Sequence, residues 1–161
     1  MYLMGLDVGT TGVKAAVFSE DGKLAGYGFE EYAVSCPRPG YAEQDAELVF
    51  QAALRVMEKA AFPVRGEIEA IGVSVQGDAV MPVDAGFHPV APVQLGMDYR
   101  CRKQADAFAR AFGAEAIFTR TGMAPHPLNS LCKMRNFIEE TPEIDDKARY
   151  YMTYADFILA R

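Results

Sequence analysis

The sequence predicts an α/β fold in which a mixed β-sheet carries flanking helices. Two observations support this class. Short apolar runs separated by turn residues fill most of the first half of the chain, which is typical of β-strands. Apolar residues at helical spacing mark one helix before residue 63 and dominate the second half. A chain of 161 residues, 50% of them apolar, has the length for one domain with a single core.

The first three strands are predicted at residues 2–6, 13–18 and 23–32. The tetrapeptide Gly9-Thr10-Thr11-Gly12 separates the first two strands. Residues 20–22 (Glu-Asp-Gly) separate the second from the third, and Asp-Gly between apolar runs is a strong hairpin signal. Strands joined by such tight turns form an antiparallel meander.

An amphipathic helix of about four turns is predicted next. Asp45 is expected to be its N-cap, and Pro63 lies where the pattern ends. Its apolar face comprises Leu48, Val49, Ala52, Val56, Met57 and Ala60.

A buried strand is predicted at residues 68–76, which are rich in apolar and β-branched side chains. We expect this strand to join the meander in one sheet. Two shorter strands are predicted at residues 80–83 and 91–95, with a turn at residues 84–86 after the first of them.

Four further helices are predicted in the second half. One has an apolar face at residues 105–112 and ends at Gly113, and another is marked by Leu131, Met134 and Ile138. Thr141 can cap a third, which has Pro142 at its first position. The fourth begins at Tyr154, and its pattern runs to Arg161. Because a domain rarely stops inside a helical pattern, we expect the chain to be a fragment.

The composition limits the kinds of partner that the chain can bind and the cellular compartment in which it can work. Lys and Arg number 16 and Asp and Glu number 22, so the net charge is −6, which argues against nucleic acid as a partner. The chain has neither a run of 18 apolar residues nor a basic, apolar leader, so we expect no membrane association and no signal peptide. The three cysteines (Cys36, Cys101 and Cys132) are scattered, which excludes a disulfide framework and predicts a cytoplasmic protein.

The segment from Asp7 to Lys14 has the composition of a phosphate-binding turn. Its glycines allow a tight turn whose backbone N–H groups form an anion nest, and Thr10 and Thr11 add hydroxyl donors. Lys14 adds a positive charge, and Asp7 can hold Mg²⁺ directly or through water. The segment is neither a Walker A loop nor a dinucleotide fingerprint, because no Gly-Lys-Ser/Thr follows and a strand stands where a helix is required. A plain glycine-rich hairpin is the alternative, since Asp, Gly and Thr are ordinary turn residues.

The order of strand, Asp-x-Gly-Thr-Thr-Gly turn, strand, Asp-Gly turn and strand resembles the first phosphate motif of the actin-like ATPase superfamily. Over essentially its whole length, the chain resembles the N-terminal domain of the FGGY carbohydrate kinases, which include xylulokinase, gluconokinase and glycerol kinase. This resemblance implies a ribonuclease H-like fold. The segments that carry it follow in the family's order: residues 4–14, 39–45, 71–78 and 98–100, then Thr121-Gly122 with Pro127 and Lys133.

The resemblance also implies cofactors and site residues. ATP and Mg²⁺ would be the cofactors, with Asp7 near the metal. The residues expected to contact the ATP phosphates are Thr10, Thr11, Gly12 and Lys14. Those expected at the sugar or polyol site are Gln76, Gly77, Asp78, Asp98 and Arg100. For Asp78 the alternative is a solvated turn residue, and for Asp98 and Arg100 it is a structural ion pair.

The substrate stays open because the signatures of the subgroups are absent. Glycerol kinases have Arg-Glu and xylulokinases have Met-His where this chain has Gly77-Asp78. Glycerol kinases also have Tyr where Leu128 stands. Related kinases often have Trp near the substrate, and this chain has none.

By the same resemblance, the general-base Asp and the adenosine-binding domain are expected beyond Arg161. We therefore expect the full-length protein to phosphorylate a sugar or polyol hydroxyl with ATP, and residues 1–161 to be inactive alone. The alternative is a non-catalytic binding module of the same fold. An actin-like ATPase without a sugar substrate would leave residues 76–78 and 121–122 unexplained. Truncation should also leave apolar sheet surface uncovered, so we expect the isolated chain either to be less stable than the full-length protein or to self-associate, for example as a homodimer.

Overall fold

The computed structural model describes residues 1–161, and its central feature is a four-stranded sheet with the order β3-β2-β1-β5. Strands β1 (Tyr2–Val8), β2 (Gly12–Ser19) and β3 (Leu24–Glu31) form the predicted antiparallel meander. Strand β5 (Ile68–Val75) pairs in parallel with β1, so the sheet is mixed, as predicted.

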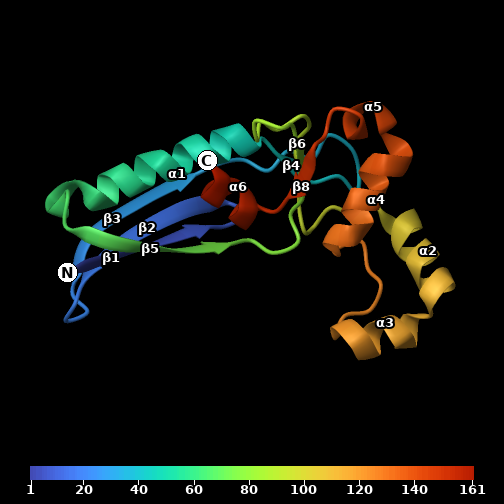
Figure 1. Cartoon of the computed structure of the whole chain (residues 1–161), viewed down its shortest axis with the longest axis horizontal. Helices are drawn as coiled ribbons and strands as arrows, with labels where there is room; N and C mark the ends of the chain where they lie inside the picture. The colour runs from blue at the N-terminus through green and yellow to red at the C-terminus, as the bar shows by residue number, and fades with distance from the viewer.

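Helix α1 (Ala46–Ala61) lies along one face of this sheet (Figure 1). The Asp45 side chain accepts hydrogen bonds from the backbone N–H groups of Glu47 and Leu48, which confirms the predicted N-cap. A 3₁₀ turn at Phe62–Val64 ends the helix. Leu48 was predicted on the apolar face but is 65% exposed, because the buried face is centred on Val49, Ala53 and Val56 instead.

Two glycines of β3 let α1 approach the sheet closely. A Cβ atom on Gly26 would collide with the backbone carbonyl of Ala60, and one on Gly28 would collide with that of Val56. Backbone therefore packs on backbone here, with no side chain between the helix and the strand.

Helix α6 (Tyr154–Ala160) completes the main core beside α1. Its N-terminus is a capping box formed by Thr153 and Asp156. Tyr154 and Phe157 are fully buried, and the Phe157 ring meets Phe50 of α1 edge-on at 5.8 Å. The core lies between α1, α6 and the face of the sheet that carries Leu6, Val8, Val13, Ala15 and Val17.

The opposite face of the sheet is open. Leu3, Phe18, Tyr27 and Phe29 lie on this face and are between 41% and 49% exposed, as expected for a sheet with an uncovered side. The prediction that the strand at residues 68–76 is buried was wrong. β5 is an edge strand that α6 covers only in part, and Ile71 is 53% exposed.

Most of the second half of the chain, α6 excepted, builds the other end of the elongated molecule (Figure 1). Two small antiparallel ladders connect it to the sheet: β4 (Glu43–Gln44) with β7 (Val93–Gln94), and β6 (Met81–Val83) with β8 (Tyr150–Met152). The helices are α2 (Arg102–Phe112), α3 (Ala114–Thr121), α4 (Ser130–Glu140) and α5 (Pro142–Asp145). None of the helices in the chain combines the length and apolar character that crossing a bilayer requires.

Helix α2 ends at Gly113, as predicted, but the face of α4 differs from the prediction. Leu131 and Ile138 were expected to mark its buried side, yet they are 59% and 50% exposed. The side of α4 that faces the protein carries Cys132, Lys133, Asn136 and Phe137. Thr141 precedes α5, but its hydroxyl donates back to the Phe137 carbonyl and does not cap the new helix.

Candidate functional site

The turn at residues 9–12 closes the β1–β2 hairpin and presents free backbone donors. The N–H of Gly9 donates to the Gly12 carbonyl at 3.0 Å. The backbone N–H groups of Thr10 and Thr11 have no hydrogen-bond partner within the chain. Two adjacent unpartnered N–H groups in a turn are the feature that makes an anion nest.

The glycines of this turn are needed for space. The sequence predicted that they permit a tight turn, and neither Gly9 nor Gly12 has a positive φ in it. A Cβ atom on Gly12 would lie 2.7 Å from the Glu30 carbonyl oxygen, and one on Gly9 would lie 3.1 Å from the Gly12 carbonyl oxygen. Any larger residue at position 12 would therefore push β2 away from β3.

Asp7 and Lys14 face each other on β1 and β2, at the mouth of the turn. Both are exposed on the open face of the sheet, and Lys14 Nζ lies 6.0 Å from the centre of the Phe29 ring. No group of three or more His, Cys, Asp or Glu side chains is close enough together to hold a metal. Protein-bound Mg²⁺ commonly uses one or two carboxylates and completes its shell with phosphates and water. Asp7 alone therefore fits a magnesium ion that arrives with a nucleotide.

Beneath the turn lies a buried hydrogen-bond network centred on Gln44, the last residue of β4. Gln44 Nε2 donates to the Thr10 carbonyl at 2.6 Å. Gln44 Oε1 accepts from Gln76 Nε2 at 2.9 Å and from the Tyr154 hydroxyl at 3.1 Å. The Thr10 hydroxyl donates to Gln76 Oε1 at 3.1 Å. The network thus ties the turn at residues 9–12 to the end of β5.

Two tyrosines support this network as neutral donors. The Tyr32 hydroxyl donates to the Gly9 carbonyl at 2.7 Å. Burial, with a smaller effect of the Asp7 carboxylate, raises the pKa of Tyr32 to about 12. Burial also raises the pKa of Tyr154 well above its usual range. Both phenols therefore keep their protons at neutral pH.

A cavity of about 270 Å³ opens beside the network. Thr10, Gln76 and Gly77 form one side of it, and residues 95–97 form the other. The structure therefore brings together one residue predicted to contact phosphate and two residues predicted to contact sugar.

The loop at residues 123–129 closes in near this cavity because a buried lysine holds it. Lys133 is fully buried, and its ammonium donates to the carbonyls of Pro127 (3.0 Å) and Leu128. A Cβ atom on Gly96 would lie 3.2 Å from the Leu128 side chain, so the loop touches the wall of the cavity. Desolvation lowers the pKa of Lys133, and no carboxylate lies within ion-pair distance.

The other predicted sugar-site residues lie elsewhere. Asp78 does not line the cavity; its φ is +56°, and its carboxylate accepts hydrogen bonds from Ser130 of α4. Asp98 is fully buried and accepts from the Ala42 backbone N–H at 2.8 Å and from the Arg100 guanidinium at 2.6–3.0 Å. In this position Asp98 has no free face for a ligand.

Arg100, the ion-pair partner of Asp98, also contacts a second carboxylate. Its guanidinium also donates to Glu43 at 2.6 Å and lies 3.7 Å from the centre of the Tyr41 ring. Burial acts to lower the pKa of Arg100, but the hydrogen bonds that it donates to Asp98 and Glu43 outweigh burial and raise that pKa. The predicted Asp98–Arg100 pairing is confirmed, and Arg100 lines a different cavity from Gln76.

Sequence reasoning assigned no role to three residues of the network. Gln44 lies in one of the segments that carried the resemblance, and its polar side chain beside a predicted helix start was the available signal. For Tyr32 and Tyr154 the sequence offered no such signal, because an aromatic residue in a strand or helix usually belongs to the core.

Comparisons with known proteins give one consistent result. Residues 2–161 match the model of the FGGY family of carbohydrate kinases, N-terminal domain. The chain is 29% identical over 159 residues to a gluconokinase of Bacillus subtilis and 27% identical over 150 residues to a glycerol kinase of Thermococcus kodakarensis, covering 98% and 91% of this chain. It spans about a third of the length of these curated relatives (31% and 30%).

Solved structures agree. A gluconate kinase from Lactobacillus acidophilus superposes with a TM-score of 0.90 at 23% identity, over 98% of this chain and 32% of that one. A likeness of this degree shows that the fold is shared, and the predicted ribonuclease H-like, actin-like ATPase fold is confirmed.

Proposed function

The chain belongs to the FGGY family of carbohydrate kinases, and from that premise we propose that it is the sugar-binding N-terminal part of an enzyme that phosphorylates a sugar or polyol hydroxyl with ATP. The observation that carries this proposal is the shared cavity of Thr10, Gln76 and Gly77. It places the anion nest and the loop after β5 at one opening, as transfer of a phosphoryl group to a bound alcohol requires.

On this proposal, each residue predicted to bind phosphate or metal has a physical task. The free N–H groups of Thr10 and Thr11 bind phosphate oxygens, and Gly12 keeps the turn close to β3. Lys14 adds a positive charge beside them, and Asp7 holds the Mg²⁺ that accompanies the nucleotide. Nucleotide and metal together supply the transferable phosphoryl group and neutralise its charge.

The sugar side is built from polar groups that the network orients. Gln76 is fixed by Thr10 and Gln44, so its amide stands in one orientation at the cavity wall. At Gly77 the wall of the cavity is not crowded, since no atom lies within 4 Å of the position that a Cβ atom would take. The Asp78 carboxylate, on the same loop, accepts hydrogen bonds from Ser130. It binds a substrate hydroxyl either in addition to these hydrogen bonds or in place of them. Fixed polar groups of this kind discriminate strongly between sugars.

We propose further that the active protein extends beyond Arg161. The chain spans about a third of the length of its relatives, and none of its carboxylates lines the cavity as a general base would. The proposal therefore places the general-base Asp and the adenosine-binding domain in the following sequence. The 161-residue chain is inactive alone, and its open sheet face favours a homodimer in isolation. Three free thiols suit the reducing cytoplasm, where we place the protein.

The test is an ADP-release assay on the full-length protein with gluconate, glycerol and xylulose as acceptors. We expect ADP release that depends on one of these acceptors, and none from residues 1–161 alone. Lys14→Met should raise the KM for ATP about tenfold, since a charge beside the nest is lost. Lys23→Met is the matched control, because Lys23 is exposed in the other hairpin turn and pairs only with Asp21.

Three outcomes would contradict the proposal in different ways. Sugar binding without phosphorylation of any acceptor would favour the binding module. Acceptor-independent ATP hydrolysis would favour an actin-like ATPase. Acceptor-dependent turnover by residues 1–161 would show that no later Asp is needed.

A further inference from the structure

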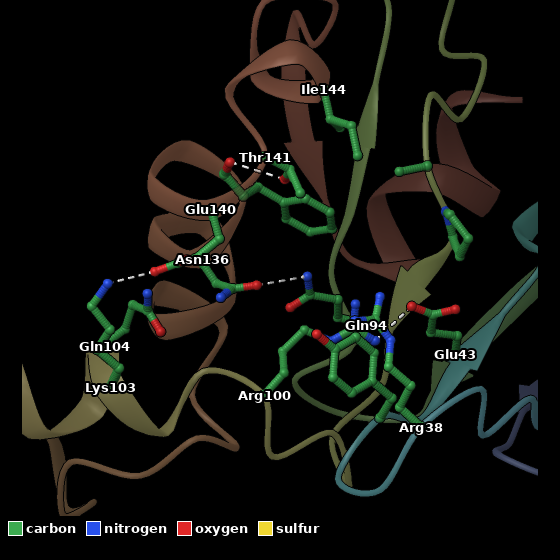
Figure 2. A pocket seen from close by; sticks show the side chains of 14 residues that line it. Arg38, Glu43, Gln94, Arg100, Lys103, Gln104, Asn136, Glu140, Thr141 and Ile144 are labelled. Carbon is green, nitrogen blue, oxygen red and sulfur yellow. Dashed lines mark hydrogen bonds and ion pairs between the residues drawn. The ribbon is translucent and has the colours of Figure 1, made fainter.

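A second and larger cavity, of about 470 Å³, lies between the β4–β7 ladder and helices α2, α4 and α5. It shares no lining residue with the Thr10–Gln76 cavity. The backbone at the end of β7 separates the two, since its last residue, Gln94, lines the larger cavity and the next residue, Leu95, lines the smaller. Figure 2 shows Lys103 and Glu140 at one end of the larger cavity, Arg38 and Glu43 at the other, and Gln94 and Asn136 between them.

The wall of this cavity carries hydrogen-bonding groups that the chain does not satisfy. Two buried side-chain oxygens lack a hydrogen-bond partner, Gln94 Oε1 and Gln104 Oε1, and both belong to residues of this wall. The amide nitrogens of the same residues are in use: Gln94 Nε2 donates to Asn136 Oδ1 at 3.2 Å, and Gln104 Nε2 donates to Glu139 Oε2 at 3.0 Å. A buried polar atom without a partner is costly, and two at one cavity point to a ligand or water that supplies hydrogen bonds.

The cavity has one cation without a carboxylate partner. Arg38, Arg100 and Lys103 line it against the carboxylates of Glu43 and Glu140. Arg100 pairs with both Glu43 and Asp98, and Lys103 pairs with Glu140, each at 2.6 Å. Arg38 has no carboxylate within ion-pair distance, and its guanidinium lies 4.7 Å from the centre of the Tyr41 ring. One cation is therefore left to bind an acidic group.

We propose that this cavity binds a small anion that carries several hydroxyl groups. A hydroxyl can donate to an amide oxygen and accept from an amide nitrogen, so hydroxyls match a wall of Gln and Asn side chains. The acidic group, a carboxylate or a phosphate monoester, pairs with Arg38, since a guanidinium binds either in a bidentate manner. The volume is within the range of small-molecule sites.

Binding requires a modest adjustment of the wall. The two unpartnered oxygens are almost covered by neighbouring atoms, so side chains must rotate before a hydroxyl can reach them. Rotamer changes of this kind are common when ligands bind. Arg38 and Lys103 are exposed at the two ends of the cavity and are free to turn.

The experiment is calorimetric titration of the full-length protein without nucleotide, with four probes. Gluconate and glucose 6-phosphate carry both hydroxyls and a charge, xylitol carries hydroxyls alone, and inorganic phosphate carries charge alone. We expect at least one of the charged, hydroxylated probes to bind tenfold or more tightly than xylitol and phosphate. The comparison of gluconate with glucose 6-phosphate distinguishes a carboxylate from a phosphate ligand.

Variants assign the binding to this cavity. Arg38→Ala is exposed and breaks no ion pair, so it should fold normally and weaken binding about tenfold or more. Gln104→Leu removes one hydroxyl partner and should also weaken binding, while Lys23→Met, which lies in a hairpin turn and lines neither cavity, should leave it unchanged. The proposal is overturned if no probe binds, if neutral xylitol binds as tightly as the anions, or if Arg38→Ala and Gln104→Leu both leave binding unchanged. It can fail while the kinase activity stands, because the two cavities share no residue.

Discussion

Asp78 caps helix α4: its Oδ1 accepts hydrogen bonds from the Ser130 backbone N–H at 3.2 Å and from the Ser130 hydroxyl at 2.9 Å. Asn129 occupies the N-cap position, but its side chain makes no capping bond. Asp78 therefore supplies, from 52 residues away, the acceptor that the helix N-terminus lacks. The contact holds the loop after β5 against the helical half of the molecule.

Two substitutions at this position separate its structural from its substrate-binding role. Asp78→Asn keeps an acceptor oxygen and tolerates the left-handed φ of +56°, so we expect a nearly unchanged free energy of unfolding. Asp78→Ala loses the cap and should lower that free energy by about 1–2 kcal/mol. Urea denaturation measures both. A sugar affinity that falls in the stable Asp78→Asn variant would identify a substrate contact; equal destabilisation by both changes would contradict the capping role.

The close packing of α1 on β3 predicts an asymmetry among the glycines. Gly26→Ala should lower the free energy of unfolding by about 1–3 kcal/mol, because the new methyl group meets the Ala60 carbonyl. Gly72→Ala is the matched control, since it lies in the same sheet with no atom within 4 Å of its Cβ position and should change stability by less than about 0.5 kcal/mol. Equal effects of the two substitutions would show that helix and strand are not in backbone contact.

The buried Asp98–Arg100 pair predicts a large cost for removing its negative charge. Asp98→Asn leaves a buried guanidinium with Glu43 as its remaining carboxylate, and we expect a loss of about 3–5 kcal/mol in the free energy of unfolding. Asp21→Asn breaks the exposed pair with Lys23 and should have little or no effect. Denaturation of the two variants in parallel gives the comparison, and a small loss in Asp98→Asn would refute a structural role for this pair.

The three thiols should react at very different rates. Cys36 is exposed, whereas Cys101 and Cys132 are buried. Burial raises the pKa of Cys101 from 9.0 to about 11 and also raises that of Cys132. Two pH units correspond to about 100-fold less thiolate at a given pH, in addition to the steric barrier. A thiol reagent at pH 8 should label one cysteine rapidly and the other two only in denaturant; rapid labelling of all three in the native protein would contradict this packing.

Stability should fall in alkaline solution. The pKa of Tyr32 is raised in the folded state from 10.0 to about 12, and burial raises that of Tyr154 as well. Because the folded state favours the protonated phenols, their contribution is complete below pH 10 and is lost as the pH rises through 12. Urea midpoints should therefore be lower at pH 11 than at pH 8. Tyr32→Phe and Tyr154→Phe should each reduce this difference, and an unchanged pH dependence in both would count against the assignment.

The meander could be predicted because its signals are local. The turns at residues 9–12 and 20–22 and the apolar runs beside them fix strand order and direction within 31 residues. The N-cap Asp45 was predictable for the same reason. Burial was harder to predict, since it depends on partners distant in sequence. Leu131 and Ile138 have the spacing of a buried face, but α4 turns Cys132 and Lys133 inward because the ammonium group satisfies two loop carbonyls.

The candidate site was predictable in its parts but not in its arrangement. Thr10, Gln76 and Gly77 could each be named from a motif, and the structure brings them together at one cavity. No pattern in the sequence shows that Asp78 bonds to Ser130 or that Asp98 is enclosed, because both contacts depend on how the two halves of the chain pack. Gln44 could not be predicted as the centre of the network either. The network joins four segments, which carry Thr10, Gln44, Gln76 and Tyr154, and these meet only in the folded protein.

The Tyr154–Gln44 hydrogen bond has a consequence for synthesis on the ribosome. Tyr154 follows Gln44 by 110 residues, so at about 5–20 residues per second the nascent chain waits roughly 5–20 s before this partner is made. During that interval the meander and α1 can already form, while the side chain beneath the Thr10 turn still lacks one of its donors. The end of the sheet that carries the Thr10 turn is thus among the first parts translated and the last to become rigid.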